Sequence, residues 1–402
     1  MTTSAIAWID FADADRRKMI AAVSAFRDRD TRDELGFGSV RDALSDLLLP
    51  GTSTLQTRAR YFLFVPWIYQ HLEQRRVPSR RIGDRLRHDE IHLMSLLRES
   101  GERGVIGERS GASLQRFPSS IYWRGFSAWG IMRFAGSQQQ YHRWLDTYYQ
   151  RTRQGTRPED GASLSELPQP IWDPNLPAAS AGFLDEATFQ LSPEEAAYLR
   201  ERLLLTCPDA VLATMVDLCD PVNAVDYVWQ HPQLARLTAE QLVLVDHARR
   251  FSEATYGAVL LYNLMLAELR DEPERSERYR ADLVTWRESS LTAGLLSRPW
   301  DRGEFWQFVL DAGRIPAMTR RFVNRWLDLL PELLGPSEAA DNHEARRLVR
   351  QRERWLKRGR SRFDSRRHLE LWSGAAGLGQ INYRWGVVRT LINDIVIGLG
   401  RE

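Results

Sequence analysis

Helix-start signals and apolar residues at helical spacing recur along this sequence, whereas the strict alternation typical of strands is scarce. The run Ser192–Glu195 (SPEE) joins a capping residue, a proline at the first helical position and a glutamate three residues after the cap. The capping-box spacing recurs at Thr238–Gln241, where the pattern predicts a helix that runs to about Leu269. The sequence therefore predicts a mainly helical protein.

Further helices are predicted on both sides of the centre. The hydroxyls of residues 52–54 should cap a helix through Arg58 and Tyr61, and Pro66 should kink or end that helix. Aromatic residues, glycine and serine cluster at 114–131, which is compatible with a small β element. The other predicted helices span Asp13–Phe26, Ser39–Leu49, Glu304–Leu310, Met318–Leu334, His343–Lys357 and Gln380–Leu399.

Residues 151–187 form the best candidate for a boundary between domains. This stretch holds five prolines and little periodicity, and it is longer than most loops inside one domain. The length of 402 residues suits two or three domains. We therefore predict an N-terminal helical domain over 1–150, a proline-rich linker over 151–187 and a C-terminal helical domain over 188–402.

The start of the chain and its apolar runs argue against export and against a membrane. Acidic residues at 10, 13 and 15 fall where a signal peptide needs apolar ones. The longest apolar run, 61–69, is nine residues, while a membrane-spanning helix needs about 20. Two cysteines cannot build a disulfide framework or a four-thiolate zinc site. We expect a cytoplasmic protein with reduced thiols and no membrane contact.

The positive charge is almost all arginine and is unevenly placed. Only Lys18 and Lys357 are lysines among the 55 basic residues. Codon bias explains the total, so only placement is informative. Residues 1–160 carry a net charge of +6, residues 161–340 carry −11 and residues 341–402 carry +7. Either the basic and acidic surfaces serve different partners, or the basic ends fold against the acidic middle.

The basic end near residue 350 is the leading candidate for nucleic-acid contact. On a helix, one face would carry Arg346, Arg350, Arg354 and Lys357, a row suited to a phosphate backbone. Interleaved aromatic residues could stack on exposed bases. The alternative is a solvated basic face with the aromatics in the core. The predicted phosphate contacts are Arg346, Arg347, Arg350, Arg354, Lys357 and Arg358, and the predicted stacking residues are Trp355, Tyr383 and Trp385.

A second candidate has the outline of a helix-turn-helix. A predicted helix at Ser39–Leu49 is followed by the turn at 49–52 and by a segment that carries Gln56, Arg58 and Arg60. This outline is common in helical proteins. We expect these three residues to contact DNA or a partner protein.

The sharpest enzyme-like feature is the run His88-Asp89-Glu90-Ile91-His92. On a helix, His88 and His92 share a face at the spacing that grips zinc, but no third ligand is evident and neighbouring arginines would repel a cation. A solvated helix face is the alternative. There is no phosphate-binding loop of the GxxxxGK[ST] type, so ATP hydrolysis by this chain is not expected, and no cofactor is predicted.

Three stretches resemble a bacterial family of unknown function, the domain-of-unknown-function family 6361. They are the opening WIDF (8–11), the run from Arg27 to Tyr69 and the closing LWSGAAGLGQINYRW (371–385). The resemblance implies a cytoplasmic protein of similar length that is encoded near helicases, nucleases or methyltransferases of phage-defence islands. It supplies no catalytic residues.

These observations lead to one main hypothesis and two alternatives. The main hypothesis is a non-catalytic DNA- and protein-binding subunit of a bacterial multi-protein anti-phage defence assembly, with helicase, nuclease or methyltransferase partners. The first alternative is a metal-dependent hydrolase or nuclease that uses His88 and His92. The second is a scaffold whose arginines serve ion pairs and solubility.

Overall fold

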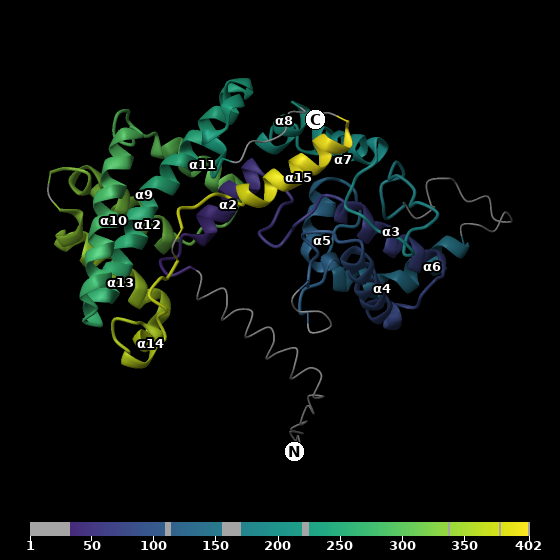
Figure 1. Ribbon diagram of the computed structural model, residues 1–402, viewed down its shortest axis with the longest axis horizontal. Coiled ribbons are helices and arrows are strands. Elements are labelled where there is room, and N and C mark those ends of the chain that lie inside the picture. Colours follow the sequence, from purple (N-terminus) through teal and green to yellow (C-terminus); the bar gives the residue numbers. More distant parts are fainter. Residues whose placement is uncertain are drawn as a thin grey trace, which may run out of the picture. The chain divides into compact units, whose positions relative to one another are not determined.

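The part of the chain that the structure describes is mainly helical (Figure 1). Within that part, β pairing is limited to two isolated bridges, Met132 with Trp172 and Phe183 with Glu186. The prediction of a mainly helical protein is therefore confirmed. The computed structural model describes residues 33–108, 114–154, 170–218, 225–336, 338–377 and 379–400.

The chain divides into two compact units, each built from two separate stretches of the sequence. Unit 1 comprises Met1–Asp42 and His247–Ile381, and unit 2 comprises Ala43–Asp246 and Asn382–Glu402. The divisions fall inside α2 (Gly38–Leu48) and α9 (Ala239–Leu269). The predicted linker lies partly outside the described residues.

Unit 2 is built on a buried helix, α3 (Tyr61–Gln74), that packs against α4 and α5, while α4 also packs against α6. The C-terminal helix α15 returns to this unit and packs on α7 and α8. The remaining bounds are α4 (Ser79–Glu99), α5 (Pro118–Ala128), α6 (Gln138–Gln154), α7 (Pro193–Thr206), α8 (Val211–Asp217), η3 (Val228–Gln230), η4 (Pro232–Arg236) and α15 (Trp385–Gly398).

Unit 1 is organised around the long helix α9. Two tryptophans bond to its carbonyls: Trp286 Nε1 donates to Glu253 O at 2.7 Å, and Trp326 Nε1 donates to Ala254 O at 2.7 Å. Trp286 belongs to α10 and Trp326 to α12, and α12 packs against α13. The bounds are α10 (Pro273–Thr292), α11 (Arg302–Ala312), α12 (Ala317–Leu333), η5 (Ala339–Asp341), α13 (His343–Lys357), η6 (Arg358–Arg360) and α14 (Arg366–Glu370).

Both predicted capping boxes are confirmed. At α7, Ser192 Oγ accepts from Glu195 N, and the Glu195 carboxylate accepts from Ser192 N. At α9, Gln241 N donates to Thr238 Oγ1 at 3.2 Å, and Thr238 N donates to Gln241 Oε1 at 3.1 Å. The predicted helix His343–Lys357 is α13 itself.

The predicted helix from residue 52 to 61 is wrong, because α3 begins only at Tyr61. Side chains that are distant in the sequence accept hydrogen bonds from the backbone amides of this segment. Tyr122 Oη accepts from the amides of Thr57 and Arg58, and Asp394 Oδ2 accepts from Ala59 N. Pro66 does not end the helix, since α3 continues to Gln74. Burial of all nine residues at 61–69 offsets the lost hydrogen bond.

The β element expected at 114–131 is also wrong, because most of this stretch is α5. Pro118 occupies the first turn, where its missing amide hydrogen costs nothing. The side chain of Glu90, from α4, then accepts from Ser119 N at 2.6 Å and caps the helix. That cap comes from a residue 29 positions away, which local sequence reading does not detect. The predicted helix Asp13–Phe26 lies outside the described residues.

Replacement of Gly257 by alanine should destabilise unit 1, because α9 and α10 touch at this glycine. A Cβ atom here would lie 2.3–2.5 Å from three atoms of the Trp286 ring, which is buried and hydrogen-bonded. We expect a loss of about 1–3 kcal/mol of unfolding free energy, seen as a lower thermal midpoint. Gly83→Ala is the control, since the nearest atom there is 3.9 Å away on the exposed side of α4. Equal midpoints for the two variants would contradict this packing.

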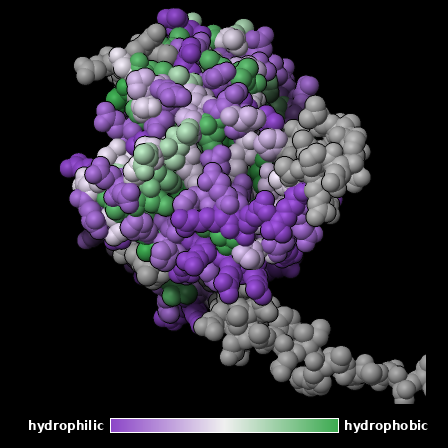
Figure 2. Space-filling view, turned by 90° about the vertical axis from the view of Figure 1, so that its right-hand side faces the viewer, coloured by the Kyte–Doolittle hydropathy of each residue, from purple (hydrophilic) through white to green (hydrophobic). Residues whose placement is uncertain are grey.

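The described surface offers no bilayer-spanning element. No helix in the described ranges combines the length and the apolar character needed to cross a lipid bilayer. On the face shown in Figure 2, hydrophilic residues predominate and hydrophobic residues occur in small patches.

Candidate nucleic-acid interface

Helix α13 has one buried side and one exposed side. Its buried residues are Ala345, Leu348, Val349, Arg352 and Glu353. Successive side chains turn by about 100°, so the side opposite the core is occupied by a row of arginines. We call this row, with the C-cap residue that follows the helix, the α13 arginine face. It consists of Arg347, Arg350, Arg354 and Arg358, all exposed.

Two members of the predicted row are held inside unit 1 instead. Arg346 pairs with Glu268 of α9 and donates to Ala340 O at 2.7 Å. The ammonium of Lys357 lies 3.2 Å from Glu34, and only 11% of the Lys357 side chain is exposed. Of the six predicted phosphate contacts, Arg346 and Lys357 border the core, whereas Arg347, Arg350, Arg354 and Arg358 are exposed.

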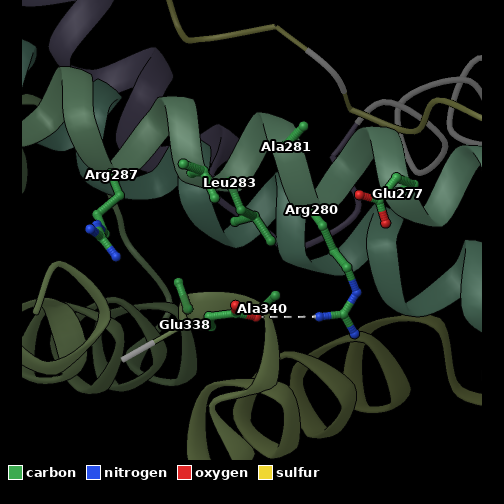
Figure 3. A pocket seen from close by; sticks show the side chains of 9 residues that line it. Glu277, Arg280, Ala281, Leu283, Arg287, Glu338 and Ala340 are labelled. Carbon is green, nitrogen blue, oxygen red and sulfur yellow. Dashed lines mark ion pairs between the residues drawn. The ribbon is translucent and has the colours of Figure 1, made fainter. Parts of the chain in front are cut away.

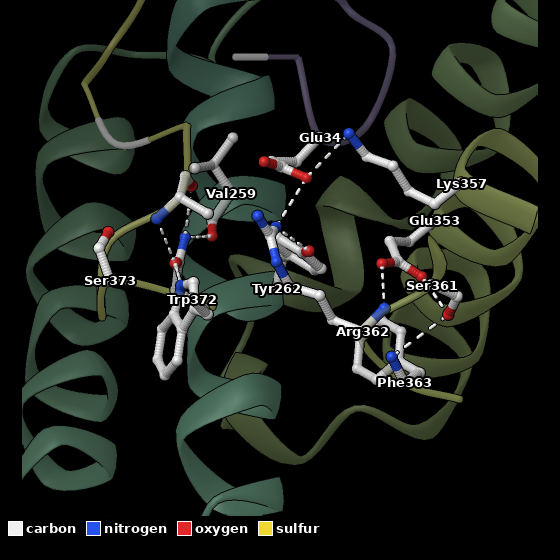
Figure 4. A network of polar contacts seen from close by, with 12 residues as sticks. Glu34, Val259, Tyr262, Glu353, Lys357, Ser361, Arg362, Phe363, Trp372 and Ser373 are labelled. Carbon is white, nitrogen blue, oxygen red and sulfur yellow. Dashed lines mark hydrogen bonds and ion pairs between the residues drawn. The ribbon is translucent and has the colours of Figure 1, made fainter. Parts of the chain in front are cut away.

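Glu34 belongs to a group of polar contacts at the end of α13 that Figure 4 draws with Lys357 and Arg362, and we call this group the Glu34 network. The buried Glu34 carboxylate lies 2.8 Å from Arg362 and 3.2 Å from Lys357. Arg362 Nη1 also donates to Tyr262 Oη at 2.8 Å. Glu353 accepts from Ser361 Oγ and from Arg362 N, at 2.6 and 2.8 Å. The network gives these cations a structural role.

Arg352 is a third basic residue of α13 that is not available to a ligand. It is 4% exposed, and its Nε donates to Leu35 O at 2.8 Å while Nη2 donates to Thr319 Oγ1 at 2.8 Å. Burial lowers the pKa of its guanidinium to about 10. Gly36 has a left-handed backbone (φ +74°), and a Cβ there would lie 2.2 Å from Arg352 Nη2. Arg352 thus fastens the start of the described chain to α13.

The exposed arginines have weak partners or none. Arg347 pairs with Glu344, and Arg354 pairs with Asp364 at 2.5 Å, both near the surface. The Arg350 guanidinium lies 5.4 Å from the centre of the Phe363 ring. In the described residues, Arg350 and Arg358 have no acidic partner. Exposed pairs contribute at most about 1 kcal/mol, so a phosphate can replace them.

Only one of the three predicted stacking residues has an exposed ring. Trp355 is 47% exposed, and its ring lies 5.2 Å from the Arg352 guanidinium. Tyr383 and Trp385 are 1% and 0% exposed, in the core of unit 2. A base cannot reach those two rings, so Trp355 alone remains a candidate.

The three residues of the predicted helix-turn-helix are engaged within unit 2. Gln56 is 2% exposed and Nε2 donates to Gly51 O at 3.0 Å. Arg58 forms a bidentate ion pair with Asp394, with N–O distances of 2.9–3.0 Å. Arg60 forms an ion pair with Glu195 at 2.7 Å. These side chains hold the 52–60 segment in place. They are not free to contact DNA, and the helix-turn-helix is not formed.

The histidine pair on α4 does not form a metal centre with a third ligand. His92 Nε2 contacts Leu184 O at 2.9 Å, and His88 Nδ1 lies 3.1 Å from Asp89 Oδ1. Across the described ranges, no three histidine, cysteine, aspartate or glutamate side chains come together as a metal site. The arrangement gives the metal-dependent alternative no further support.

Two buried carboxyl groups in unit 2 were not singled out by the sequence. Burial raises the pKa of Glu90 to about 8 and the pKa of Glu73 to about 7. Glu90 accepts from Ser119, and Glu73 accepts from Tyr141 Oη and from Trp172 Nε1. Within the described residues neither forms an ion pair. Both carboxyl groups therefore favour the neutral form.

The stability of unit 2 should fall as the pH rises from 6.5 to 8.5. In the folded chain the pKa values of Glu73 and Glu90 lie above their ordinary value of 4.5, so protonation of these side chains stabilises the folded state. This stabilisation is lost as the pH rises through about 7 for Glu73 and about 8 for Glu90. Partly buried His142, whose pKa is lowered to about 4, opposes this decline only near pH 6.5, where the histidine of the unfolded chain loses its proton. Urea unfolding should give a decline that is reduced in E73Q/E90Q. An unchanged decline in that variant would contradict the assignment.

A small pocket lies between α10 and η5 in unit 1 (Figure 3). Its volume is about 330 Å³, and both Arg280 and Arg287 line it. Arg280 is engaged by Glu268 and Asp341, each at 2.9 Å. Arg287 Nε is buried without a hydrogen-bond partner in the described residues. The apolar lining of the pocket comes from Ala281, Leu283 and Val284. We assign no ligand to it.

Comparison with known proteins identifies the chain's family but no activity. No curated protein and no solved structure matches it. The matching family model is described as "Family of unknown function (DUF6361)" and covers residues 3–397. The match spans both units and the α13 arginine face. The chain therefore belongs to the family of unknown function DUF6361.

Proposed function

We propose that this chain is a non-catalytic nucleic-acid-binding subunit that contacts DNA phosphate through the α13 arginine face. The observation that carries the proposal is the row of four exposed arginines, Arg347, Arg350, Arg354 and Arg358, on the side of α13 opposite the core. Arg366 and Arg367 of α14 extend the positive charge, and the Arg366 side chain is 92% exposed.

The chemistry of this face suits a phosphate backbone. A guanidinium offers a planar fork of donors that matches two phosphate oxygens, and it keeps its charge at every physiological pH. The nearby acids Glu344, Asp364 and Glu370 are exposed and compete weakly. Because a single aromatic ring, that of Trp355, is exposed beside the row, binding should depend on charge more than on base stacking.

The proposed partners follow from the family resemblance. Proteins of this family are expected beside helicases, nucleases or methyltransferases of phage-defence islands, so the chain would act as a DNA-contacting subunit of such an assembly. The missing phosphate-binding loop agrees with a motor supplied by a partner.

Binding of the purified chain to labelled 30-base-pair duplex DNA and to the matching single strand tests the proposal. We expect binding at 50 mM salt, a preference for the duplex because of its higher charge density, and a linear fall of log affinity with log salt concentration. Failure to bind either form at 50 mM salt would overturn the proposal and favour a scaffold without nucleic-acid contact.

A further inference from the structure

A second concentration of exposed arginines lies in unit 2, where α3 ends and α4 begins. Residues 75–87 hold six arginines and a single acid, Asp84. Arg87 lies over the Phe117 ring, and we call the other five arginines, which are all exposed, the α4 arginine surface. They are Arg75, Arg76, Arg80, Arg81 and Arg85. We infer that this surface binds the phosphate backbone of duplex nucleic acid, at a site separate from the α13 arginine face.

Four of the five arginines of the α4 arginine surface make no polar side-chain contact with the described residues of the fold, while Arg80 lies near Asp146. Helix α4 buries Ile82, Leu86 and Glu90 on one side, and its arginines project from the others. Within the described part of the chain, Arg75, Arg76, Arg81 and Arg85 form no ion pair and no side-chain hydrogen bond. This separates them from the α13 arginine face, where Arg347 and Arg354 already have acidic neighbours.

The position of these charges on the helix is unfavourable for stability. A helix N-terminus carries a partial positive charge and favours acids, yet the first turn of α4 has none and instead contains Arg80 and Arg81. The cap comes from α6, where Asp146 accepts from Ser79 N at 2.9 Å and from Ser79 Oγ at 2.5 Å. Asp146 also interacts electrostatically with Arg80, but Arg75, Arg76, Arg81 and Arg85 have no acidic partner in the described part of the chain. An external anion is therefore the partner that their placement fits.

Helix α6 adds positive charge at the same end of unit 2. The contact between Ser79 and Asp146, and the approach of Gly83 to His142, show that α6 runs antiparallel to α4. The last turn of α6 therefore lies at the end where α4 begins. That turn carries Arg151 and Arg153, both exposed. The surface thus combines charges from three helices, which suits a long polyanion better than a single small anion.

The α4 arginine surface has no large exposed hydrophobic side chain in its described residues, and this favours nucleic acid over the other polyanionic partners. The exposed large hydrophobic side chains of the described residues all lie outside 75–92 and 138–154. A helix that lies on a membrane inserts an apolar face, and a protein interface has an apolar or aromatic centre. Contacts with a phosphate backbone need neither, and arginine forks are suited to them.

The experiment compares the full chain with R75A/R81A/R85A and with a control, R103A/R116A/R236A, that removes three exposed arginines elsewhere in unit 2. The probe is a labelled 30-base-pair duplex, followed by anisotropy from 50 to 200 mM salt. For the α4 variant we expect at least about a tenfold loss of affinity and a log–log slope that is smaller by about 2–3 charges. The control should bind like the unaltered chain.

This experiment distinguishes failure of the inference from failure of the proposed function. The two proposals share the ligand, duplex nucleic acid, but place it on different arginines. Loss of duplex binding in the α4 variant, with R350A/R354A/R358A unaffected, would support this inference and overturn the α13 site. Loss confined to the α13 variant would overturn this inference alone. Binding of the unaltered chain to phosphatidylserine vesicles or poly-glutamate, with no binding to the duplex, would also overturn it. Thermal midpoints within about a degree of the unaltered chain confirm that the variants fold.

Discussion

Replacement of Glu34 by alanine is expected to cost about 3–5 kcal/mol of unfolding free energy, because it leaves two cations without their shared carboxylate in a poorly hydrated place. Glu34 is 4% exposed as a residue, and the Lys357 and Arg362 side chains are 11% and 15% exposed. Chemical unfolding followed by circular dichroism measures the change. The loss should appear in the transition of unit 1.

The control for this prediction is Glu370→Ala, which removes one exposed member of the pair with Arg366. That change should cost no more than about 1 kcal/mol. If the two variants were equally stable, the Glu34 network would not anchor the end of α13. Lys357 and Arg362 would then have to be reconsidered as ligand contacts.

Charge reversal on the α13 arginine face is expected to lower the affinity for duplex DNA by about a hundredfold or more at 100 mM salt. The variant is R350E/R354E/R358E, which keeps every contact of the Glu34 network because none of these residues belongs to it. Its control is R278E/R298E/R320E, which reverses three exposed arginines that lie on other elements of unit 1. Both variants change the net charge equally, so a general charge effect would weaken both to the same degree.

The parts of this fold that the sequence predicts are those fixed by local interactions. Ser192 with Glu195 and Thr238 with Gln241 are three residues apart, and each pair forms the reciprocal bonds that the spacing implies. The 52–60 segment and α5 were predicted wrongly because their backbone donors bond to distant side chains, those of Tyr122 and Glu90. The division into two units depends on such long-range contacts as well.

At the candidate interface, too, the sequence predicts the helix but not the environment of its individual side chains. Arginine spacing on α13 correctly predicts a basic helix, but not which arginines face solvent. Which basic side chains face solvent depends on Glu268 and Glu34, which form ion pairs with Arg346 and Lys357. The isolation of Arg81 and Arg85 on α4 is likewise a property of the folded chain, since acids such as Asp84 and Asp89 stand nearby in the sequence.

The most direct test of the proposed DNA contact is the salt dependence of duplex binding by the unaltered chain and by R350A/R354A/R358A. If these arginines touch phosphates, each removed contact lowers the slope of log affinity against log salt by about 0.9, so the variant's slope should be smaller by about 2.7. Identical slopes and affinities for the two proteins would contradict the claim that the α13 arginine face contacts DNA.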